Sequence, residues 1–346
     1  MLYPRTVELS VAGFEEIDGR RVARVAKDDS FELEVLASLE DDHVPPERVE
    51  LRYRLPNGRG SRDDMIKVGE ALAGRDKSQL FRYTLQRVSS DLQLDVVGGD
   101  DRIRDLWLQV VERPSVTKIV FDFVYPEYLN LAPQNVSATD RVEILEGTFS
   151  VCHISSSKPL RSITVHDPTN QREVPAQLDP DEPTKAAFEI EPSGEDQIFL
   201  ITLTDTYGVE NRDPYRLVAA VVPDAPPEVN VGLTGIGTAI TPQANIPWRG
   251  TITDEYGLQD VWYETQVGEN APNRWNLAGD YRQQQELDRL PSLDLAEVDR
   301  GTNRPRIELQ PGDQLSLSAQ ASDFYDLTNS PHVGRSQRYL LDGVTE

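Results

Sequence analysis

The sequence predicts an all-β protein made of three tandem immunoglobulin-like β-sandwich domains. One pattern occurs three times, an alternating apolar strand that runs into an Asp-containing corner, at residues 92–101, 198–208 and 315–326. The copies lie about a hundred residues apart, which is the size of one small β-sandwich. Period-two alternation of apolar and polar residues dominates the chain, whereas the 3.6-residue period of amphipathic helices is scarce. A chain of 346 residues has room for three such domains, each with its own core.

The first predicted domain covers residues 1–115. Its expected strands are 7–11, 30–37, 48–55, 80–88, 92–97 and 106–111. In the second of these strands Phe31, Leu33 and Val35 fall on one face and charged residues fall on the other, as one side of a sandwich requires. A glycine-rich and charged stretch lies between the strands, and we expect a short helix in it at 64–73.

The second predicted domain covers residues 116–223 and the third covers 224–346. A Pro-rich joint at 222–227 separates them, and its consecutive prolines make it a semi-rigid linker. The strands expected in the second domain are 117–124, 149–154, 160–166, 186–190, 198–204 and 215–222. Those expected in the third are 248–253, 258–267, 306–309, 315–321 and 338–341. Residues 268–304 form a long insertion in the third domain, which we expect to be partly helical at 283–287.

The composition bears on partners and compartment. A formal charge of −24 repels phosphate backbones and anionic lipids, and no cluster of Lys and Arg offsets it, so we expect no nucleic-acid binding. The longest apolar run, residues 217–222, is far shorter than a bilayer-spanning helix, so we expect no direct membrane insertion in this stretch. Glu8, Glu15 and Glu16 interrupt any apolar signal-peptide core, so this chain shows no signal peptide. Either it is cytoplasmic or Met1 begins a fragment.

Catalytic and cofactor-binding patterns do not assemble in the sequence. The four histidines, His43, His153, His166 and His332, lack the spacings of zinc sites. The single cysteine, Cys152, has no activating group nearby and is expected to be a small buried apolar residue. We therefore expect no catalytic residues and no cofactor, although the abundance of carboxylates leaves glycosidase chemistry open.

A local motif, Thr-Asp-x-Tyr-Gly, occurs twice, around Asp205 and Asp254. We interpret it as a strand-ending corner, in which the Asp accepts hydrogen bonds from the next amides and the Gly supplies a positive φ. The alternative is a weak calcium site assembled from Asp205, Asp224, Asp254 and Glu255, whose carboxylates are the oxygen ligands that Ca²⁺ takes. The fixed Asp spacing of dedicated calcium loops is missing, which favours the corner.

The insertion contains the best candidates for ligand contact. Trp275 and Tyr281 are expected to be exposed there, and an exposed aromatic pair stacks well on sugar rings. Arg274 and Arg282 flank them and would pair with an acidic or sugar ligand. The interpretation that we favour for the insertion as a whole is nevertheless that it packs back on its sandwich, and the ligand role is the alternative.

Seven segments carry a resemblance to a known protein family. They are YPEYLNLAP at 125–133, EGTFSVCHISSSKPL at 146–160, TDTYGV at 204–209 followed by VVPDAPPEV at 221–229, TDEYGL at 253–258, QPGDQLSLSAQASD at 310–323 and VGRSQRYLL at 333–341. In this order they resemble the immunoglobulin-like extracytoplasmic region of large membrane-anchored bacterial proteins of unknown function. The likeness covers most of residues 80–346 and departs from the family pattern at 129–132. It implies an immunoglobulin-like fold and an extracytoplasmic, anchored setting, but no chemistry.

We therefore expect a non-enzymatic extracytoplasmic spacer and protein-interaction module, in the periplasm or at the cell surface, that belongs to a larger membrane-anchored protein. A protein partner is the first expectation. The alternative is a carbohydrate-binding or cell-wall-binding module that uses the insertion, which exposed aromatic residues beside a groove would favour. A hydrolase is the third hypothesis, and close carboxylates of raised pKa in a deep pocket would favour it.

Overall fold

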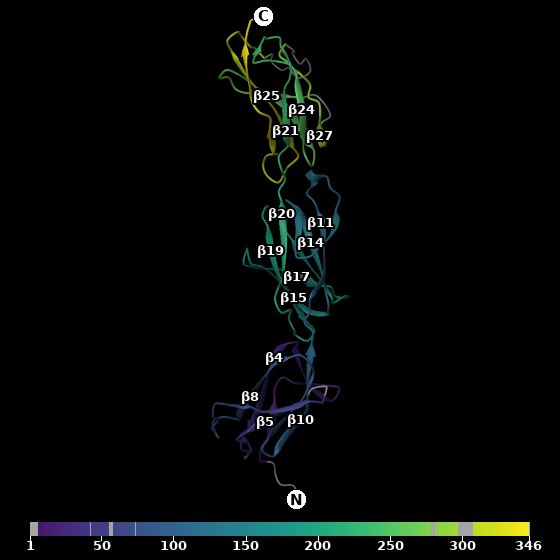
Figure 1. The fold of residues 1–346 in the computed structure, drawn as a ribbon, viewed down its shortest axis with the longest axis vertical. Helices are drawn as coiled ribbons and strands as arrows, with labels where there is room; N and C mark the ends of the chain where they lie inside the picture. Colours follow the sequence, from purple (N-terminus) through teal and green to yellow (C-terminus); the bar gives the residue numbers. More distant parts are fainter. Residues whose placement is uncertain are drawn as a thin grey trace. The chain divides into compact units, whose positions relative to one another are not determined.

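The computed structural model describes residues 6–41, 43–54, 58–72, 74–277, 281, 283–296 and 307–345. Over these residues the regular structure consists of strands, with one short 3₁₀ helix, η1 (Glu127–Leu129) (Figure 1). The all-β prediction is therefore confirmed. Within the described part of the chain, no helix is both long and apolar enough to cross a bilayer.

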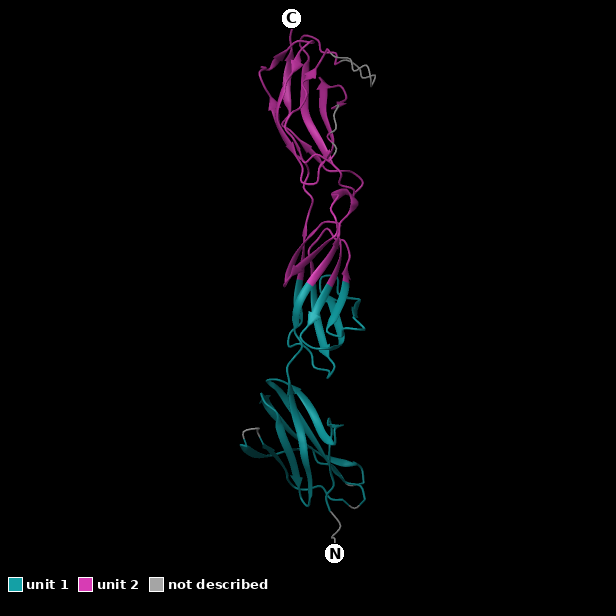
Figure 2. Cartoon of the chain, turned by 90° about the vertical axis from the view of Figure 1, so that its right-hand side faces the viewer, with its two compact units in different colours: residues 1–119, 153–188, 199–217 teal, residues 120–152, 189–198, 218–346 magenta. Residues whose placement is uncertain are grey.

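The chain divides into two compact units, shown in two colours in Figure 2. Unit 1 consists of Met1–Ile119, His153–Phe188 and Phe199–Leu217. Unit 2 consists of Val120–Cys152, Glu189–Ile198 and Val218–Glu346. The division does not follow the three predicted domains, because it runs through strands in the middle of the chain. The domain boundaries at 115 and 223 thus stay a prediction.

Ten strands of unit 1 form two sheets. The first sheet has the order β1 (Leu9–Val11), β4 (Asp29–Ser38), β8 (Ser78–Val88), β7 (Ile66–Val68), and the second has the order β2 (Glu15–Ile17), β3 (Arg20–Ala26), β10 (Asp101–Val111), β9 (Leu92–Gly98), β5 (Val49–Arg54), β6 (Gly60–Asp64). The predicted alternation is correct, since Leu33 and Val35 of β4 and Leu51 of β5 are fully buried in one core.

The short helix predicted at 64–73 is wrong. Residues 60–64 and 66–68 are instead the edge strands β6 and β7, which pair with β5 and β8. β-branched Ile66 and Val68 suit an edge strand, and their backbone groups satisfy one side of β8. Pairing with the neighbouring strands β5 and β8 therefore decided the structure of this segment.

The middle of the chain contributes two five-stranded sheets. Their orders are β12 (Gln134–Ala138), β11 (Val116–Val124), β14 (Phe149–Ser156), β18 (Lys185–Ile190), β17 (Ala176–Leu178), and β13 (Arg141–Leu145), β20 (Tyr215–Val222), β19 (Gln197–Asp205), β15 (Leu160–Asp167), β16 (Arg172–Val174). Cys152 is fully buried in β14, as predicted, and the exposed His153 beside it agrees with the outward position that alternation requires.

The last eleven strands lie in unit 2. A three-stranded sheet has the order β21 (Glu228–Leu233), β24 (Trp248–Thr253), β27 (Glu286–Leu287). A larger sheet has the order β22 (Ala239–Ile240), β31 (Tyr339–Gly343), β29 (Gln314–Asp323), β25 (Leu258–Val267), β26 (Asn273–Asn276), and β30 (Val333–Arg335) also pairs with β29. In a third, two-stranded sheet β23 (Asn245–Ile246) pairs with β28 (Leu293–Asp294). Three of these strands, β26, β27 and β28, lie inside the predicted insertion. The helix predicted at 283–287 is wrong, because Glu286–Leu287 pairs with β24.

A parallel pairing recurs in the three parts of the chain. β3 runs parallel to β10, β13 runs parallel to β20, and β22 runs parallel to β31. In each case an early strand meets the last strand of its own segment. The recurrence is a structural repeat that matches the repeat of Asp corners in the sequence.

Candidate functional site

The corner interpretation holds in both units. In unit 1 the carboxylate of Asp205 accepts hydrogen bonds from the amides of Tyr207 and Val209, both at 2.9 Å. In unit 2 the carboxylate of Asp254 accepts from the amides of Tyr256, at 3.0 Å, and Gly257, at 2.7 Å. These carboxylates cap the turns that follow their strands, because a short acidic side chain reaches the amides two to four residues on. The surroundings of the two corners differ.

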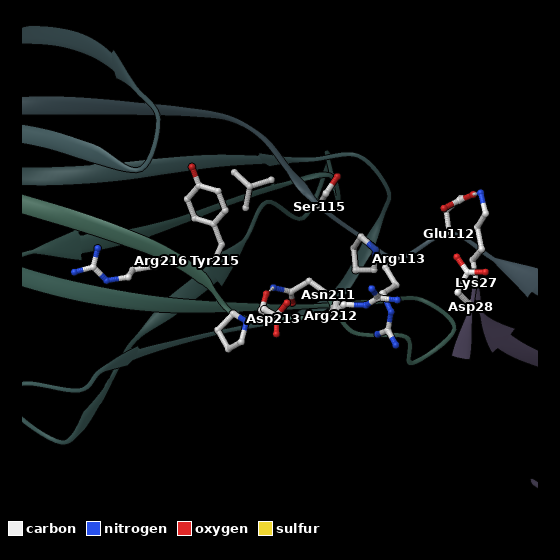
Figure 3. A pocket seen from close by; sticks show the side chains of 13 residues that line it. Lys27, Asp28, Glu112, Arg113, Ser115, Asn211, Arg212, Asp213, Tyr215 and Arg216 are labelled. Atoms are coloured by element: carbon white, nitrogen blue, oxygen red, sulfur yellow. Dashed lines mark hydrogen bonds and ion pairs between the residues drawn. The ribbon is translucent and has the colours of Figure 1, made fainter. Parts of the chain in front are cut away.

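Unit 1 has a charged groove beside its corner. The groove has a volume of 670 Å³, and Figure 3 shows the side chains that line it, namely Lys27, Asp28, Glu112, Arg113, Pro114, Ser115, Val116, Asn211, Arg212, Asp213, Pro214, Tyr215 and Arg216. Lys27 pairs with Glu112, with 2.8 Å between Nζ and Oε1. Arg113 donates to the carbonyl oxygen of Glu210 at 2.6 Å and forms an ion pair with Asp29. Charges of both signs therefore neutralise one another along this groove.

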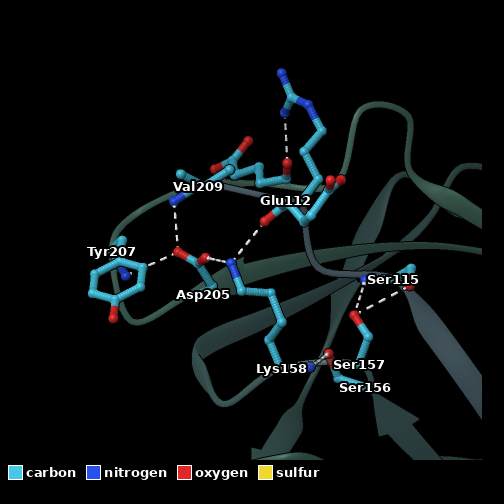
Figure 4. A network of polar contacts seen from close by, with 10 residues as sticks. Glu112, Ser115, Ser156, Ser157, Lys158, Asp205, Tyr207 and Val209 are labelled. Atoms are coloured by element: carbon cyan, nitrogen blue, oxygen red, sulfur yellow. Dashed lines mark hydrogen bonds and ion pairs between the residues drawn. The ribbon is translucent and has the colours of Figure 1, made fainter. Parts of the chain in front are cut away.

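Asp205 is fully buried next to this groove and has a lysine partner (Figure 4). Lys158 forms an ion pair with Asp205 and also donates to the carbonyl oxygen of Glu112 at 2.7 Å. Burial alone would raise the pKa of Asp205, but the bond from Lys158 and the amides of Tyr207 and Val209 outweigh burial and hold that pKa below its usual range. Lys158 thus links the corner to the segment that leads from β10 into β11.

Further contacts support the segment that leads from β10 into β11. The Ser115 amide donates to the hydroxyl of Ser157 at 3.1 Å. The guanidinium of Arg24 in β3 lies 4.2 Å from the centroid of the Tyr207 ring, within the range of a cation–π contact. Arg24 lies in β3, whereas Tyr207 follows β19, which belongs to a different sheet. Their contact therefore connects the two sheets through side chains, in addition to the chain that leads from β10 into β11.

In unit 2, Asp323 and His332 form a polar pair at the end of β29. Asp323 is 2% exposed and accepts hydrogen bonds from the amides of Tyr325 and His332, both at 3.0 Å. The Nδ1 atom of His332 lies 3.1 Å from the second carboxylate oxygen of Asp323, Oδ2. Asp323 is therefore a third capping carboxylate, as the repeated sequence pattern predicted.

Asp224, in the Pro-rich joint, approaches this pair. One ligand-type atom from each of Asp224, Asp323 and His332 lies within 4.8 Å of those of the other two. The Oδ2 atom of Asp224 is buried and has no hydrogen-bond partner. Burial, followed by the charges of Asp323 and Asp254, raises the pKa of Asp224 to about 6. Burial likewise raises the pKa of Asp254, with a smaller contribution from Asp323.

Aromatic rings surround the cluster. Tyr325 stacks on His332, with 3.8 Å between the ring centroids, and meets Tyr128 edge-on at 5.5 Å. The Tyr325 hydroxyl donates to Glu146 Oε1 at 3.0 Å. Burial, and next the hydrogen bond to Glu146, raise the pKa of the Tyr325 hydroxyl. Tyr128 lies in η1 and Glu146 follows β13, so these rings join the segment after β29 to earlier strands of unit 2.

Two glycines permit close approaches at this junction. Gly147 has a φ of +78°, and a methyl carbon of Leu327 would lie 2.5 Å from a Cβ at that position. A Cβ at Gly334 would collide with the carbonyl oxygen of Pro227. The Pro-rich joint therefore lies directly against β30, and a larger residue at Gly334 would displace it.

The calcium alternative needs Asp205, Asp224, Asp254 and Glu255. Asp205 lies in unit 1 with Lys158 as its counter-ion, and the other three lie in unit 2. Asp224 and Asp254 interact electrostatically, whereas the side chain of Glu255 is exposed. The structure adds Asp323 and His332 to this neighbourhood. Sequence reasoning missed His332, although it lies nine residues after Asp323 and this short separation was a usable signal.

The predicted exposure of Trp275 is wrong. Pairing of β26 with β25 turns its side chain into the core, where it is 9% exposed and its indole N–H donates to Thr265 Oγ1 at 2.8 Å. Tyr281 packs, partly buried, against the same core. Arg274 stacks on Trp262, 3.8 Å from the ring centroid. Arg282 lies outside the described residues. The ligand role of these four residues is untested, but the exposed aromatic pair that suggested it is not present.

Comparison with known proteins gives no family. No family model and no curated protein matches the chain. Among solved structures, dimeric latent PorU from Porphyromonas gingivalis is similar over 99% of this chain, with 10% identity and a TM-score of 0.22, and this chain spans 34% of it. A structure from work on host cell surface retention of a 1.5-MDa bacterial ice-binding adhesin is similar over 99% of both chains, with 9% identity and a TM-score of 0.31.

Proposed function

We propose that this chain is a non-enzymatic extracytoplasmic spacer and protein-interaction module of a larger membrane-anchored protein, with three immunoglobulin-like sandwiches at 1–115, 116–223 and 224–346. The observation that carries the proposal is the use of polar side chains at the ends of sheets. Lys158 binds the carbonyl of Glu112, and Arg113 binds the carbonyl of Glu210. Such contacts hold successive sheet pairs together, which is the property a spacer requires.

The recurring parallel pairing of an early strand with a last strand supports the tandem organisation. It appears at β3 with β10, at β13 with β20 and at β22 with β31. Free sheet edges, such as β7 with its exposed Ile66, are the surfaces that strand-adding protein partners use. These observations favour a protein partner over a glycan.

The carboxylates of unit 2 give weaker support to a hydrolase. The carboxylates of Asp254 and Asp323 each accept hydrogen bonds from two backbone amides, and the carboxylate of Asp323 also contacts the imidazole of His332. Oxygens occupied in this way stabilise turns. A general acid and a nucleophile have to face a substrate instead.

Protease accessibility tests the proposed location and role together. The parent protein, carrying an epitope tag in an exposed loop of this region, is expressed in bacterial cells, and an external protease is added to intact cells and to spheroplasts. An extracytoplasmic module is digested from outside without cell lysis, and a cytoplasmic control protein survives. Protection of this region in spheroplasts would contradict the proposal. Purified envelope proteins and cell-wall fragments, tested for binding by surface plasmon resonance, then separate a protein partner from a glycan.

A further inference from the structure

We propose that Asp224, Asp323 and His332 bind one divalent transition-metal cation, of the Zn²⁺ or Mn²⁺ class. They supply two carboxylate oxygens and one imidazole nitrogen, all within 4.8 Å of one another. That spread is compatible with a single ion in contact with all three atoms, because metal–oxygen and metal–nitrogen bonds are about 2 Å long. The three residues come from the Pro-rich joint, the end of β29 and the loop before β30, so the ion ties these segments together.

A second observation at the same place indicates a positively charged ligand. Asp224 is half-buried and its carboxylate accepts a hydrogen bond from the backbone of Ala225, but its Oδ2 atom is buried without a hydrogen-bond partner, and an unpaired buried oxygen is costly. The charges of Asp323 and Asp254 act on it unfavourably, and His332 opposes them. No Lys or Arg among the residues that the structure describes forms an ion pair with these three carboxylates. At the corresponding corner of unit 1, Lys158 supplies that charge.

The donor set determines the class of ion. Ca²⁺ takes six to eight oxygen ligands, and imidazole is a poor ligand for it. Zn²⁺ and Mn²⁺ accept a mixture of carboxylate and imidazole, and water would complete their coordination. Tyr325 stacks on the His332 ring and fixes its orientation, as the neighbours of metal ligands commonly do. Metal binding does not depend on the proposed function, whereas the use of the ion as a brace rests on the spacer role.

Calorimetric titration of the whole chain tests this site. The protein is treated with a chelator, dialysed, and titrated with ZnCl₂, MnCl₂ or CaCl₂ at neutral pH. We expect saturable binding of one Zn²⁺ or Mn²⁺ ion per chain. Asp224→Asn and His332→Gln should each weaken it at least tenfold, because the first removes the negative charge of one ligand and the second removes the imidazole nitrogen. Asp224→Asn is isosteric and breaks no hydrogen bond of Oδ2, so it should fold.

Two control variants match the charge change without touching the three ligands. Asp326→Asn removes an exposed carboxylate from the same loop, and Glu255→Gln removes the exposed member of the calcium set. Both should bind like the wild type. Three outcomes overturn the site: no saturable binding, equal binding by Asp224→Asn and the wild type, or binding of Ca²⁺ alone that depends on Glu255. Protease accessibility of the parent protein does not depend on these ions, so failure of the site and failure of the proposed function are distinguishable.

Discussion

The Asp205 corner of unit 1 and the Asp323 corner of unit 2 have the same backbone chemistry and opposite electrostatics. Each carboxylate caps amides after a long strand. Lys158 approaches Asp205, whereas Asp224 approaches Asp323 and adds a second negative charge. The local motif therefore specifies a turn, and the residue brought in by another segment decides whether the corner is neutralised. Substitutions of that approaching residue therefore separate the formation of the turn from the neutralisation of its charge.

The largest effect is expected from Lys158→Met. It keeps most of the apolar length of the side chain but leaves the buried carboxylate of Asp205 without its counter-ion. We expect a loss of about 2 to 4 kcal/mol in the free energy of unfolding at neutral pH, measured by chemical denaturation. Lys27→Met is the matched control, because its ion pair with Glu112 is exposed to solvent and should contribute far less to stability. Equal losses in both variants would refute the distinction.

Asp224→Asn should act in the opposite direction. The variant removes a half-buried negative charge whose pKa is raised, so without divalent cations we expect it to be more stable at pH 7. One pKa unit corresponds to about 1.4 kcal/mol, but solvent screens this partly exposed group, so the expected gain is reduced to about 1 to 2 kcal/mol. Because folding raises the pKa of Asp224 to about 6, the folded wild type binds more protons than the unfolded chain between about pH 4 and 6. Wild-type stability from this group therefore falls as pH rises through that window.

The variant should lack this fall, and unfolding curves at pH 5 and pH 7 measure the difference. Asp205 gives the opposite sign: its pKa is lowered in the folded state, so its contribution is present above the unfolded pKa and is lost as pH falls. A wild-type to Asp224→Asn difference that does not change between pH 5 and pH 7 would contradict the assignment of the raised pKa to this carboxyl.

A smaller effect is expected from Tyr325→Phe. The variant loses the 3.0 Å hydrogen bond to Glu146 but keeps the ring that packs on His332 and Tyr128. We expect a loss of about 0.5 to 1.5 kcal/mol, measured by thermal or chemical unfolding. Glu146→Gln should cost less, because its amide oxygen still accepts the bond. A larger loss in Glu146→Gln than in Tyr325→Phe would mean that Glu146 acts through other contacts.

Much of the fold was predictable because alternation reports which residues face a core. It located the long strands and the capping role of Asp205 and Asp254. It failed at the edge strand around Ile66 and at Trp275, because both positions are decided by pairing with the neighbouring strand, β8 and β25 respectively. The cluster of Asp224, Asp323 and His332 was only partly accessible to sequence reasoning, because Asp224 comes from a different segment of the chain. Its members are separated by up to a hundred residues or so and meet only through strand order.

The burial of Cys152 has a practical consequence. It is the only cysteine of the chain, it is fully buried in β14, and burial raises the pKa of its thiol, so reagents that need an exposed thiolate will not modify it in the folded protein. The native chain is thus a background in which two engineered surface cysteines would be the only reactive thiols. Fluorescent dyes attached to such a pair would report the distance between the two labelled positions in single molecules. The native residue can stay in place throughout, so the core of β14 is not disturbed.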